Sequence, residues 1–229
     1  MGLAEMIYDL DVRGSADNMK SSSVVIENNN NKTKIKMLSL ISAGIDSPVS
    51  SYLMMRKCDL SFLHFDRGRR DDVVDILEVL KELTGKSELL LVVADHDEMM
   101  ERLKELEFPE KQTCVYCKAS MLLFAERMCE KLGCMAAVTG DSLGQVASQT
   151  LANMRAEESL LEIPVVRPLI GLDKVEIVDL ARRIGTYEIS TRRKESCPYT
   201  PKHPVTRGCS ISAGVRDVVE EIGYEVVRV

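Results

Sequence analysis

The residues of this chain that could perform chemistry begin with a run of small side chains, Ser42-Ala43-Gly44-Ile45-Asp46-Ser47, directly after an apolar segment. Backbone N–H groups in a tight, glycine-containing turn that opens onto a helix form a cradle for an anion. The hydroxyls of Ser42 and Ser47 add donors for phosphate oxygens, and the Asp46 carboxylate beside phosphate suggests an intervening Mg²⁺ ion. The run therefore predicts a phosphate-binding loop, although an ordinary strand-to-helix turn with an N-cap has a similar composition.

Cysteine is the second residue type with reactive potential. The chain has seven cysteines, an odd number, and its composition is that of a cytosolic protein, which argues against a framework of disulfides. Cys114 and Cys117 form a C-x-x-C pair at the start of a predicted helix, where a helix N-terminus favours the thiolate. The pair predicts metal ligation, a sulfur relay or redox chemistry. Three others lie in apolar contexts and are interpreted as small buried side chains: Cys58, Cys129 and Cys134.

Alternating strands and helices must position these segments. Apolar runs predict strands at 36–41, 60–65, 88–94, 135–140 and 163–169, and helical spacing predicts helices at 47–57, 71–83, 97–106, 118–132 and 173–184. Asp173 and Glu176 have the spacing of a capping box for the last of these helices. The order predicts an α/β fold, a Rossmann-like parallel sheet with helices on both faces, which binds ligands at the carboxyl ends of its strands.

Two of these segments carry a resemblance to known families. The run from Ser42 to Ser47 resembles the S-G-G-x-D-S signature of the PP-loop ATP-pyrophosphatases, with Ala43 in place of a glycine. Gly140–Leu151, GDSLGQVASQTL, resembles the G-x-S-L-G-Q-V-A-S-Q-T-L signature of the tRNA 4-thiouridine synthases. The same resemblance continues through the downstream segments Arg167–Leu169, Asp173–Ile177, Gly185-Thr186, Cys197 and Thr200–Thr206. It covers roughly residues 36 to 207, most of the chain.

The resemblance implies an adenine nucleotide alpha-hydrolase-like fold that uses ATP and Mg²⁺. The implied activity is tRNA sulfurtransfer, in which a uridine O4 is adenylated and replaced by sulfur to give 4-thiouridine, with release of AMP and pyrophosphate. Asp46, Lys174 and Cys197 would then be catalytic, and Lys174 would neutralise the departing pyrophosphate. The implied ATP-binding residues are Leu40, Ile41, Ser42, Ala43, Gly44, Ile45, Asp46, Ser47, His64, Phe65, Lys118, Gly140 and Gln149.

The cysteines allow three interpretations. Cys114, Cys117 and Cys197 could hold an iron–sulfur cluster with one iron left open for sulfide, as in a largely archaeal branch of tRNA thiolation enzymes that the pattern resembles. In the second, Cys197 carries a persulfide and forms a disulfide with a partner thiol on release. The third is a zinc site completed by Cys209 or His203. Family members that work through a persulfide commonly lack this C-x-x-C, which favours the cluster.

Domain organisation follows from the same resemblance. We expect residues 1–35 to be a partly flexible N-terminal extension with a short strand at 24–27. Residues 36–207 should form the PP-loop adenylation and thiolation domain, and 208–229 a tail packed on it. Only 41 residues precede Ser42, too few for the N-terminal tRNA-binding domains usual in the family, and the tail is too short for a rhodanese domain. A separate tRNA-binding protein, or a homodimer whose two subunits grip one tRNA, would compensate.

Bulk properties agree with a cytoplasmic location. The N-terminus lacks the pattern of a secretory signal, and no apolar run approaches the roughly 20 residues of a membrane span. The net charge of −6 argues against a protein coated in basic residues, and leaves two local clusters, Arg67–Arg70 and Arg192–Lys194, as phosphate contacts or as solvated loops. The expected partners are tRNA and a sulfur donor, either sulfide or a cysteine desulfurase. Two alternatives stay open: adenylation of a small molecule or carrier protein, and a nucleotide-binding protein without catalysis.

Overall fold

A six-stranded sheet organises the residues that the computed structural model describes, 34–144, 149–192 and 196–229. The strand predicted at 24–27 lies outside them. In chain order the elements are β1 (Lys36–Leu40), α2 (Asp46–Met55), β2 (Asp59–Asp66), α3 (Arg70–Thr84), β3 (Leu90–Asp95), α4 (His96–Leu103), the 3-10 helix η1 (Glu110–Gln112), α5 (Thr113–Leu132), β4 (Ala137–Val138), α6 (Leu151–Glu157), β5 (Val165–Val166), α7 (Lys174–Arg183), α8 (Tyr187–Thr191), α9 (Val215–Glu221) and β6 (Tyr224–Arg228).

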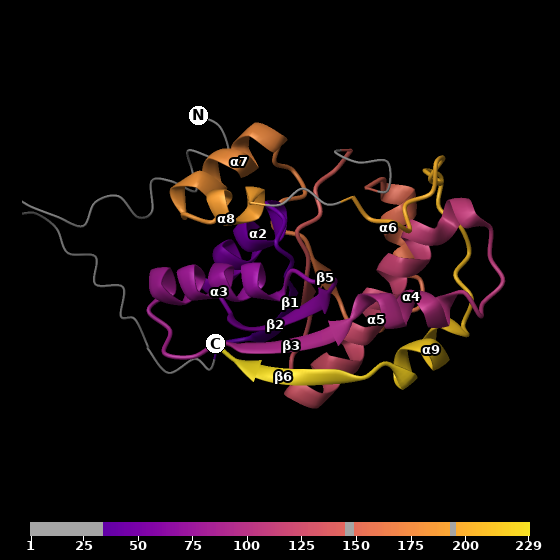
Figure 1. Ribbon diagram of the computed structural model, residues 1–229, viewed down its shortest axis with the longest axis horizontal. Coiled ribbons are helices and arrows are strands. Elements are labelled where there is room, and N and C mark those ends of the chain that lie inside the picture. Colours follow the sequence, from indigo (N-terminus) through magenta and orange to yellow (C-terminus); the bar gives the residue numbers. More distant parts are fainter. Residues whose placement is uncertain (1–33, 145–148, 193–195) are drawn as a thin grey trace, which may run out of the picture. The chain divides into compact units, whose positions relative to one another are not determined.

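The predicted parallel sheet with helices on both faces is confirmed, with one addition at its edge. The strand order is β5-β4-β1-β2-β3-β6, and the first five strands run parallel (Figure 1). β6 runs antiparallel to β3, with Leu91 opposite Val227. This strand was not predicted, because its residues are mostly exposed and do not form an apolar run.

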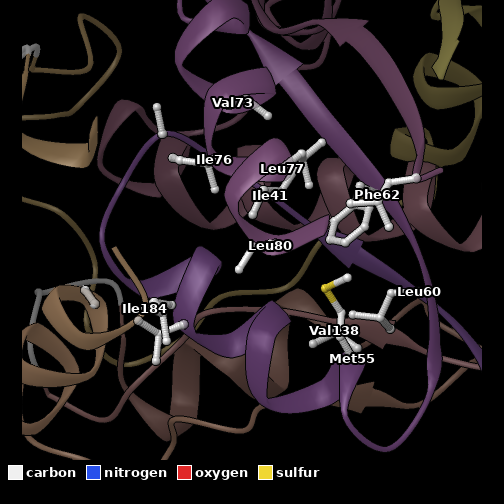
Figure 2. Packing of buried hydrophobic residues seen from close by; sticks show 14 of the residues in the cluster. Ile41, Met55, Leu60, Phe62, Val73, Ile76, Leu77, Leu80, Val138 and Ile184 are labelled. Carbon is white, nitrogen blue, oxygen red and sulfur yellow. The ribbon is translucent and has the colours of Figure 1, made fainter. Parts of the chain in front are cut away.

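Side chains that alternate along the central strands fill two separate cores. Phe62 and Leu91 point to one face, where they pack with α3 and the neighbouring helices. Figure 2 shows Phe62 on this side with the α3 residues around Leu77. Leu63 and Val92, each the next residue in its strand, point to the other face and pack against α4, α5 and α9. A continuous apolar run is therefore the right pattern for strands buried on both faces.

The connections between strands reverse direction beside β1. The chain moves from β1 outward to β2 and β3, then returns to place β4 and β5 on the opposite side of β1. The carboxyl ends of β1 and β4 therefore flank the topological switch point, where sheets of this type bind ligands. The segments Ser42–Ser47 and Thr139–Asp141 follow these two strands directly.

The helices differ from prediction mainly in length and number. α5 begins at Thr113, five residues before the predicted start, so the C-x-x-C pair lies in its first turn. α7 begins after Asp173, and its predicted capping box with Glu176 is confirmed. The short helices α6, α8 and α9 were not predicted, because five to seven residues give too little periodicity. Within the described ranges, no helix combines the length and apolarity needed to cross a membrane.

Candidate functional site

The loop after β1 is held in shape by its own serines. Ser42 N donates to Ser47 Oγ at 2.9 Å, and the two hydroxyls lie 3.0 Å apart. Gly44 N donates to Ser42 Oγ at 3.2 Å. Ala43, which stands where the PP-loop signature has glycine, is buried in the core, so its methyl group is accommodated by packing. The sequence thus builds a compact turn directly before the N-terminus of α2, the arrangement suited to an anion.

Gly140 brings the end of β4 against this loop. A Cβ at this position would lie 2.7 Å from Ser47 N and 2.8 Å from Ser47 Cα, both backbone atoms. Beside it, Ser50 Oγ donates to the Thr139 carbonyl at 2.8 Å and fastens α2 to the same strand end. Glycine is therefore required here by space, since only hydrogen fits between the two backbones.

A cavity of about 240 Å³ opens at this switch point. Of the thirteen residues predicted to bind ATP, eleven line it: Leu40, Ile41, Ser42, Gly44, Ile45, Asp46, Ser47, His64, Phe65, Lys118 and Gly140. Ala43 faces the core instead, and Gln149 lines two neighbouring pockets. Four further residues line the cavity without having been predicted: Leu63, Met121, Thr139 and Asp141.

Two of the predicted side chains on β2 form the wall opposite the loop. His64 Nδ1 donates to the Ile41 carbonyl at 3.0 Å, which ties the strand to the start of the loop. Burial lowers the pKa of His64, so the ring is held neutral. Phe65 contributes to the cavity and to the core at the same time. It lines the cavity and also packs edge-on against Phe124 in the core.

Asp141 is the polar centre of the cavity floor and is only 3% exposed. Its carboxylate accepts hydrogen bonds from Lys118 Nζ, from Thr139 Oγ1 at 2.7 Å and from Arg167 Nε at 3.3 Å. Burial alone would raise the pKa of Asp141, but Lys118, Thr139 and Arg167 together lower it. A carboxylate directly after a predicted strand was the available signal for this residue.

Asp46 and Lys174 meet although 128 positions separate them in sequence. Lys174 Nζ donates to Asp46 Oδ1 at 2.5 Å. Asp46 lines the cavity, and Lys174 lines a neighbouring pocket that Asp46 also borders. The Asp173 cap fixes the start of α7 and with it the position of Lys174. The pair places a cation and a carboxylate beside the predicted phosphate-binding loop. A cation in this place can offset the negative charge of a phosphate group.

The C-x-x-C pair lies next to this cavity. Cys114 lines a small pocket with Glu157 and Gln149, and Lys118 and Asp141 line both that pocket and the main cavity. The expectation that the helix N-terminus favours thiolate is wrong, because burial acts in the opposite direction. Burial, with a smaller contribution from Cys197, raises the pKa of Cys114.

The third predicted cysteine ligand is near the other two. Burial, then the charges of Cys197 and Cys114, raises the pKa of Cys117 to about 12, so the three sulfurs are close enough to affect one another. Cys197 itself is exposed. Across residues 34–144, 149–192 and 196–229, however, no three His, Cys, Asp or Glu side chains stand in metal-ligand geometry. The zinc site with Cys209 or His203 likewise has no support in the geometry.

The basic clusters are mostly occupied by ion pairs. Arg67 contacts Asp97 at 3.2 Å and Arg69 contacts Asp72 at 2.9 Å. Arg70 and Arg192 are paired with Glu225 and Asp75. Arg193 and Lys194 lie outside the described residues. The interpretation as solvated, paired surface groups is therefore favoured over phosphate contacts for the described arginines.

Comparison with known proteins gives the family. The family model described as Thiamine biosynthesis protein (ThiI) matches residues 32–222. The chain belongs to the ThiI family. A curated relative from Methanocaldococcus jannaschii, a probable tRNA sulfurtransferase, is 47% identical over 178 residues, covering 75% of this chain and 46% of the relative. The chain thus spans about half the length of the curated relatives it matches.

Solved structures agree with the ThiI assignment. The crystal structure of a 4-thiouridine synthetase–RNA complex with bound ATP matches with a TM-score of 0.76 at 34% identity, over 84% of this chain and 55% of that one. The NMN synthetase from Francisella tularensis matches with a TM-score of 0.50 at 12% identity, covering 84% of each chain, and supports the fold alone. The family resemblance predicted from the signatures is confirmed.

Gly140→Ala tests the contact between the two backbones in this ThiI-family site. The added methyl must push the loop away from β4, so we expect ATP affinity to fall at least tenfold and stability to fall by about 1–3 kcal/mol. Isothermal titration with ATP and urea denaturation measure both. Gly171→Ala is the matched control, because a Cβ there meets no atom within 4 Å. Equal ATP affinities for wild type and Gly140→Ala would contradict the interpretation.

Glu157 provides a test of pH dependence. Burial, the largest cause, raises the pKa of this carboxyl from 4.5 to about 7. Its proton is therefore held more tightly in the folded than in the unfolded chain. The contribution of this proton to the free energy of unfolding is complete below pH 4.5 and is lost as the pH rises through 7. This pKa difference corresponds to a loss of about 3 kcal/mol.

Glu157→Gln should remove that loss. We expect the variant and wild type to have similar free energies of unfolding at pH 5, and the variant to be the more stable at pH 8. Chemical denaturation at both pH values measures the difference. Glu162→Gln, at an exposed carboxyl, is the control. Its free energy of unfolding should differ from that of wild type by the same amount at both pH values. A difference that does not change between the two pH values would show that Glu157 ionises normally in the fold.

Proposed function

We propose that this chain is the catalytic module of an ATP-dependent tRNA sulfurtransferase, which adenylates a uridine O4 and replaces it with sulfur to form 4-thiouridine. The observation that carries the proposal is the shared wall between two sites. Lys118 and Asp141 line both the cavity beside the PP-loop and the pocket that contains Cys114. A nucleotide-activating site and a thiol site that adjoin in this way match activation followed by sulfur transfer. The similar 4-thiouridine synthetase has ATP and RNA bound.

The first half of the reaction would take place in the larger cavity. ATP phosphates would be bound at the N-terminus of α2 and by the hydroxyls of Ser42 and Ser47, which line the cavity. The uridine O4 would attack the α-phosphate, and pyrophosphate would leave. Lys174 would offset the negative charge of the leaving group. Uridine C4 then bears AMP, a far better leaving group than the original oxygen.

Mg²⁺ fits this site through the chemistry of Asp46. The carboxylate lies at the cavity rim, is 28% exposed, and is already paired with a cation, the Lys174 ammonium. Mg²⁺ commonly binds through one or two carboxylates together with substrate phosphates, which is the donor set available here. When bound, the ion would supply charge stabilisation to the phosphates. Asp46 would hold it, and Lys174 would contact the pyrophosphate.

The second half would use the cysteines. Sulfide, or a persulfide on Cys197, would attack C4 of the adenylated uridine, and AMP would leave. The chemistry of the donor set suits an iron–sulfur cluster with three protein ligands, because Cys114, Cys117 and Cys197 supply three thiols, the first two are half-buried, and the charge of Cys197 raises the pKa of both. Such a cluster would supply an iron position open to sulfide. In the persulfide alternative, the outer sulfur of a Cys197 persulfide would attack C4, and a partner thiol would then form a disulfide with Cys197 as the thiouridine is released.

Several partners follow from the proposal. The chain would act on tRNA in the cytoplasm and receive sulfur as sulfide or from a cysteine desulfurase. A separate tRNA-binding protein or a second copy of the chain would add contacts to the tRNA. The described arginines of the two basic clusters offer few of these contacts, because they are paired with carboxylates: Arg67, Arg69, Arg70 and Arg192.

The proposal predicts the products of an anaerobic assay. Protein reconstituted with iron and sulfide is incubated with ATP, Mg²⁺, sulfide and unmodified tRNA, and the digested tRNA is analysed by mass spectrometry. We expect 4-thiouridine only when ATP is present. Cys197→Ala should bind ATP with wild-type affinity and form no thionucleoside. Cys58→Ala is the matched control, because Cys58 is buried in the core away from the site.

Three results would count against this function. Normal thiolation by Cys197→Ala would exclude the role of that cysteine. Pyrophosphate release that ignores tRNA and yields no thionucleoside would point to a small-molecule or carrier-protein acceptor. Absence of any ATP turnover with every acceptor would instead support a nucleotide-binding protein without catalysis.

A further inference from the structure

A series of side-chain contacts joins Cys117 to the segment that carries Cys197. It begins at His96, the first residue of α4, whose Nε2 lies 3.4 Å from Cys117 Sγ on α5. The position of His96 is fixed locally, since Asp95 caps α4 by accepting hydrogen bonds from Asp97 N at 2.8 Å and Glu98 N at 3.0 Å. The ring is buried, with 5% exposure. A buried imidazole against a half-buried sulfur is a specific contact, and the activity proposed above assigns it no role.

The series continues from α4 to the distant loop through Tyr199. The rings of His96 and Tyr199 lie 5.8 Å apart between centroids. Tyr199 Oη donates to Asp97 Oδ1 at 3.0 Å, and the same carboxylate oxygen lies 3.7 Å from His96 Nδ1. Asp97 therefore faces both rings. These contacts join positions 102 residues apart in sequence, so they exist only in the folded protein.

A tight turn couples Tyr199 to Cys197. Thr200 N donates to the Cys197 carbonyl at 3.2 Å, which closes a four-residue turn with Pro198 in its second position. Proline favours this position because its fixed φ matches the turn. The closed turn keeps the backbone of Cys197 at a nearly fixed separation from that of Tyr199. A contact that fixes Tyr199 therefore also fixes Cys197.

Two cations strengthen the attachment of Tyr199. Arg67 Nε donates to Asp97 Oδ1 at 3.2 Å, and its guanidinium carbon lies 5.9 Å from the Tyr199 ring centroid. Lys104 Nζ lies 5.8 Å from the same centroid. Both distances are within the range of cation–π attraction. Arg67 thus has a local function in the fold that is separate from binding phosphate.

We propose that His96, Asp97 and Tyr199 form a positioning network that holds the Cys197 turn beside Cys117. This inference rests on the proposed function, in which the two cysteines cooperate in sulfur delivery. The network touches neither ATP nor the uridine, so its members are positioning residues. His96 Nε2 and Cys117 Sγ lie within hydrogen-bonding distance of each other, so the buried ring fixes the position of the sulfur. Hydrogen bonds of this kind orient sulfur ligands and tune them.

Cross-linking of thiols tests the network without requiring any activity. The reduced, metal-free full chain is treated anaerobically with dibromobimane, a short reagent that bridges two nearby thiols, and the linked peptides are quantified by mass spectrometry. The Cys114–Cys117 link, within one turn of α5, is the internal reference because it does not depend on the Cys197 turn. The quantity measured is the ratio of the Cys117–Cys197 link to this reference.

Matched variants separate positioning from general packing. Tyr199→Phe keeps the ring and removes the hydroxyl that binds Asp97, and we expect the ratio to fall at least threefold. Tyr224→Phe, a similar change on β6, should leave the ratio unchanged. His96→Leu should lower the ratio. His96→Gln should restore at least half of the loss, because its amide places an N–H near the position of Nε2.

Thermal melting and ATP titration of each variant identify global effects. We expect ATP affinity and melting temperature close to wild type for Tyr199→Phe, since the network lies outside the nucleotide cavity. Ratios within 1.5-fold of wild type for both Tyr199→Phe and His96→Leu would overturn the network, as would absence of the Cys117–Cys197 link from the wild-type protein. Neither result would bear on thiolation itself, which the tRNA assay decides separately.

Discussion

The close approach of Gly140 to the backbone of Asp46 and Ser47 is the constraint on which the site depends. Any side chain at position 140 would collide with main-chain atoms that cannot move independently of α2. Because β4 ends against the loop after β1, the residues that follow both strands face one cavity. The Ser50 bond to the Thr139 carbonyl strengthens the same junction. The switch point of the sheet is thus fixed by backbone contact, and the chemical groups are arranged around it.

Asp141 extends this junction toward the thiols. A buried carboxylate is costly unless it is paired, and here it is compensated by Lys118, Arg167 and the Thr139 hydroxyl. Lys118 comes from α5, one residue after Cys117, so the carboxylate also fixes the helix turn that presents the C-x-x-C pair. Arg167 follows β5 and brings the outermost parallel strand into the same network. Removing this carboxylate would take away the only ion-pair partner of Lys118 among the described residues, whereas Arg167 would keep its ion pair with Glu158.

The pKa values of the cysteines reflect two opposing effects, burial and the position of a thiol near a helix N-terminus. A location in the first turn of a helix favours thiolate, but the loss of hydration outweighs it for Cys114 and Cys117. Cys197 differs because it is exposed, on a turn held by Tyr199. Its position beside the other two depends on contacts from α4.

Much of this molecule could be predicted from the sequence because the decisive signals are local. The PP-loop run, the Gly140–Leu151 signature, the α7 capping box and the five parallel strands each depend on residues close together in the chain. Apolar runs identify strands buried on two faces, and capping residues fix where helices begin. The family followed from the same signatures, and eleven of the thirteen predicted nucleotide residues line one cavity.

Only the tertiary structure decided the features that depend on distant residues meeting. The pairing of Asp46 with Lys174, the central position of Asp141, and the contacts from His96 to Tyr199 join segments separated by 20 to more than 100 positions. No local pattern in the sequence indicates such long-range contacts. The antiparallel β6 and the short helices were missed because exposed or brief elements are stabilised by what they pack against. The direction of the thiol pKa values also needed the structure, since burial is a property of the fold and not of the helix position.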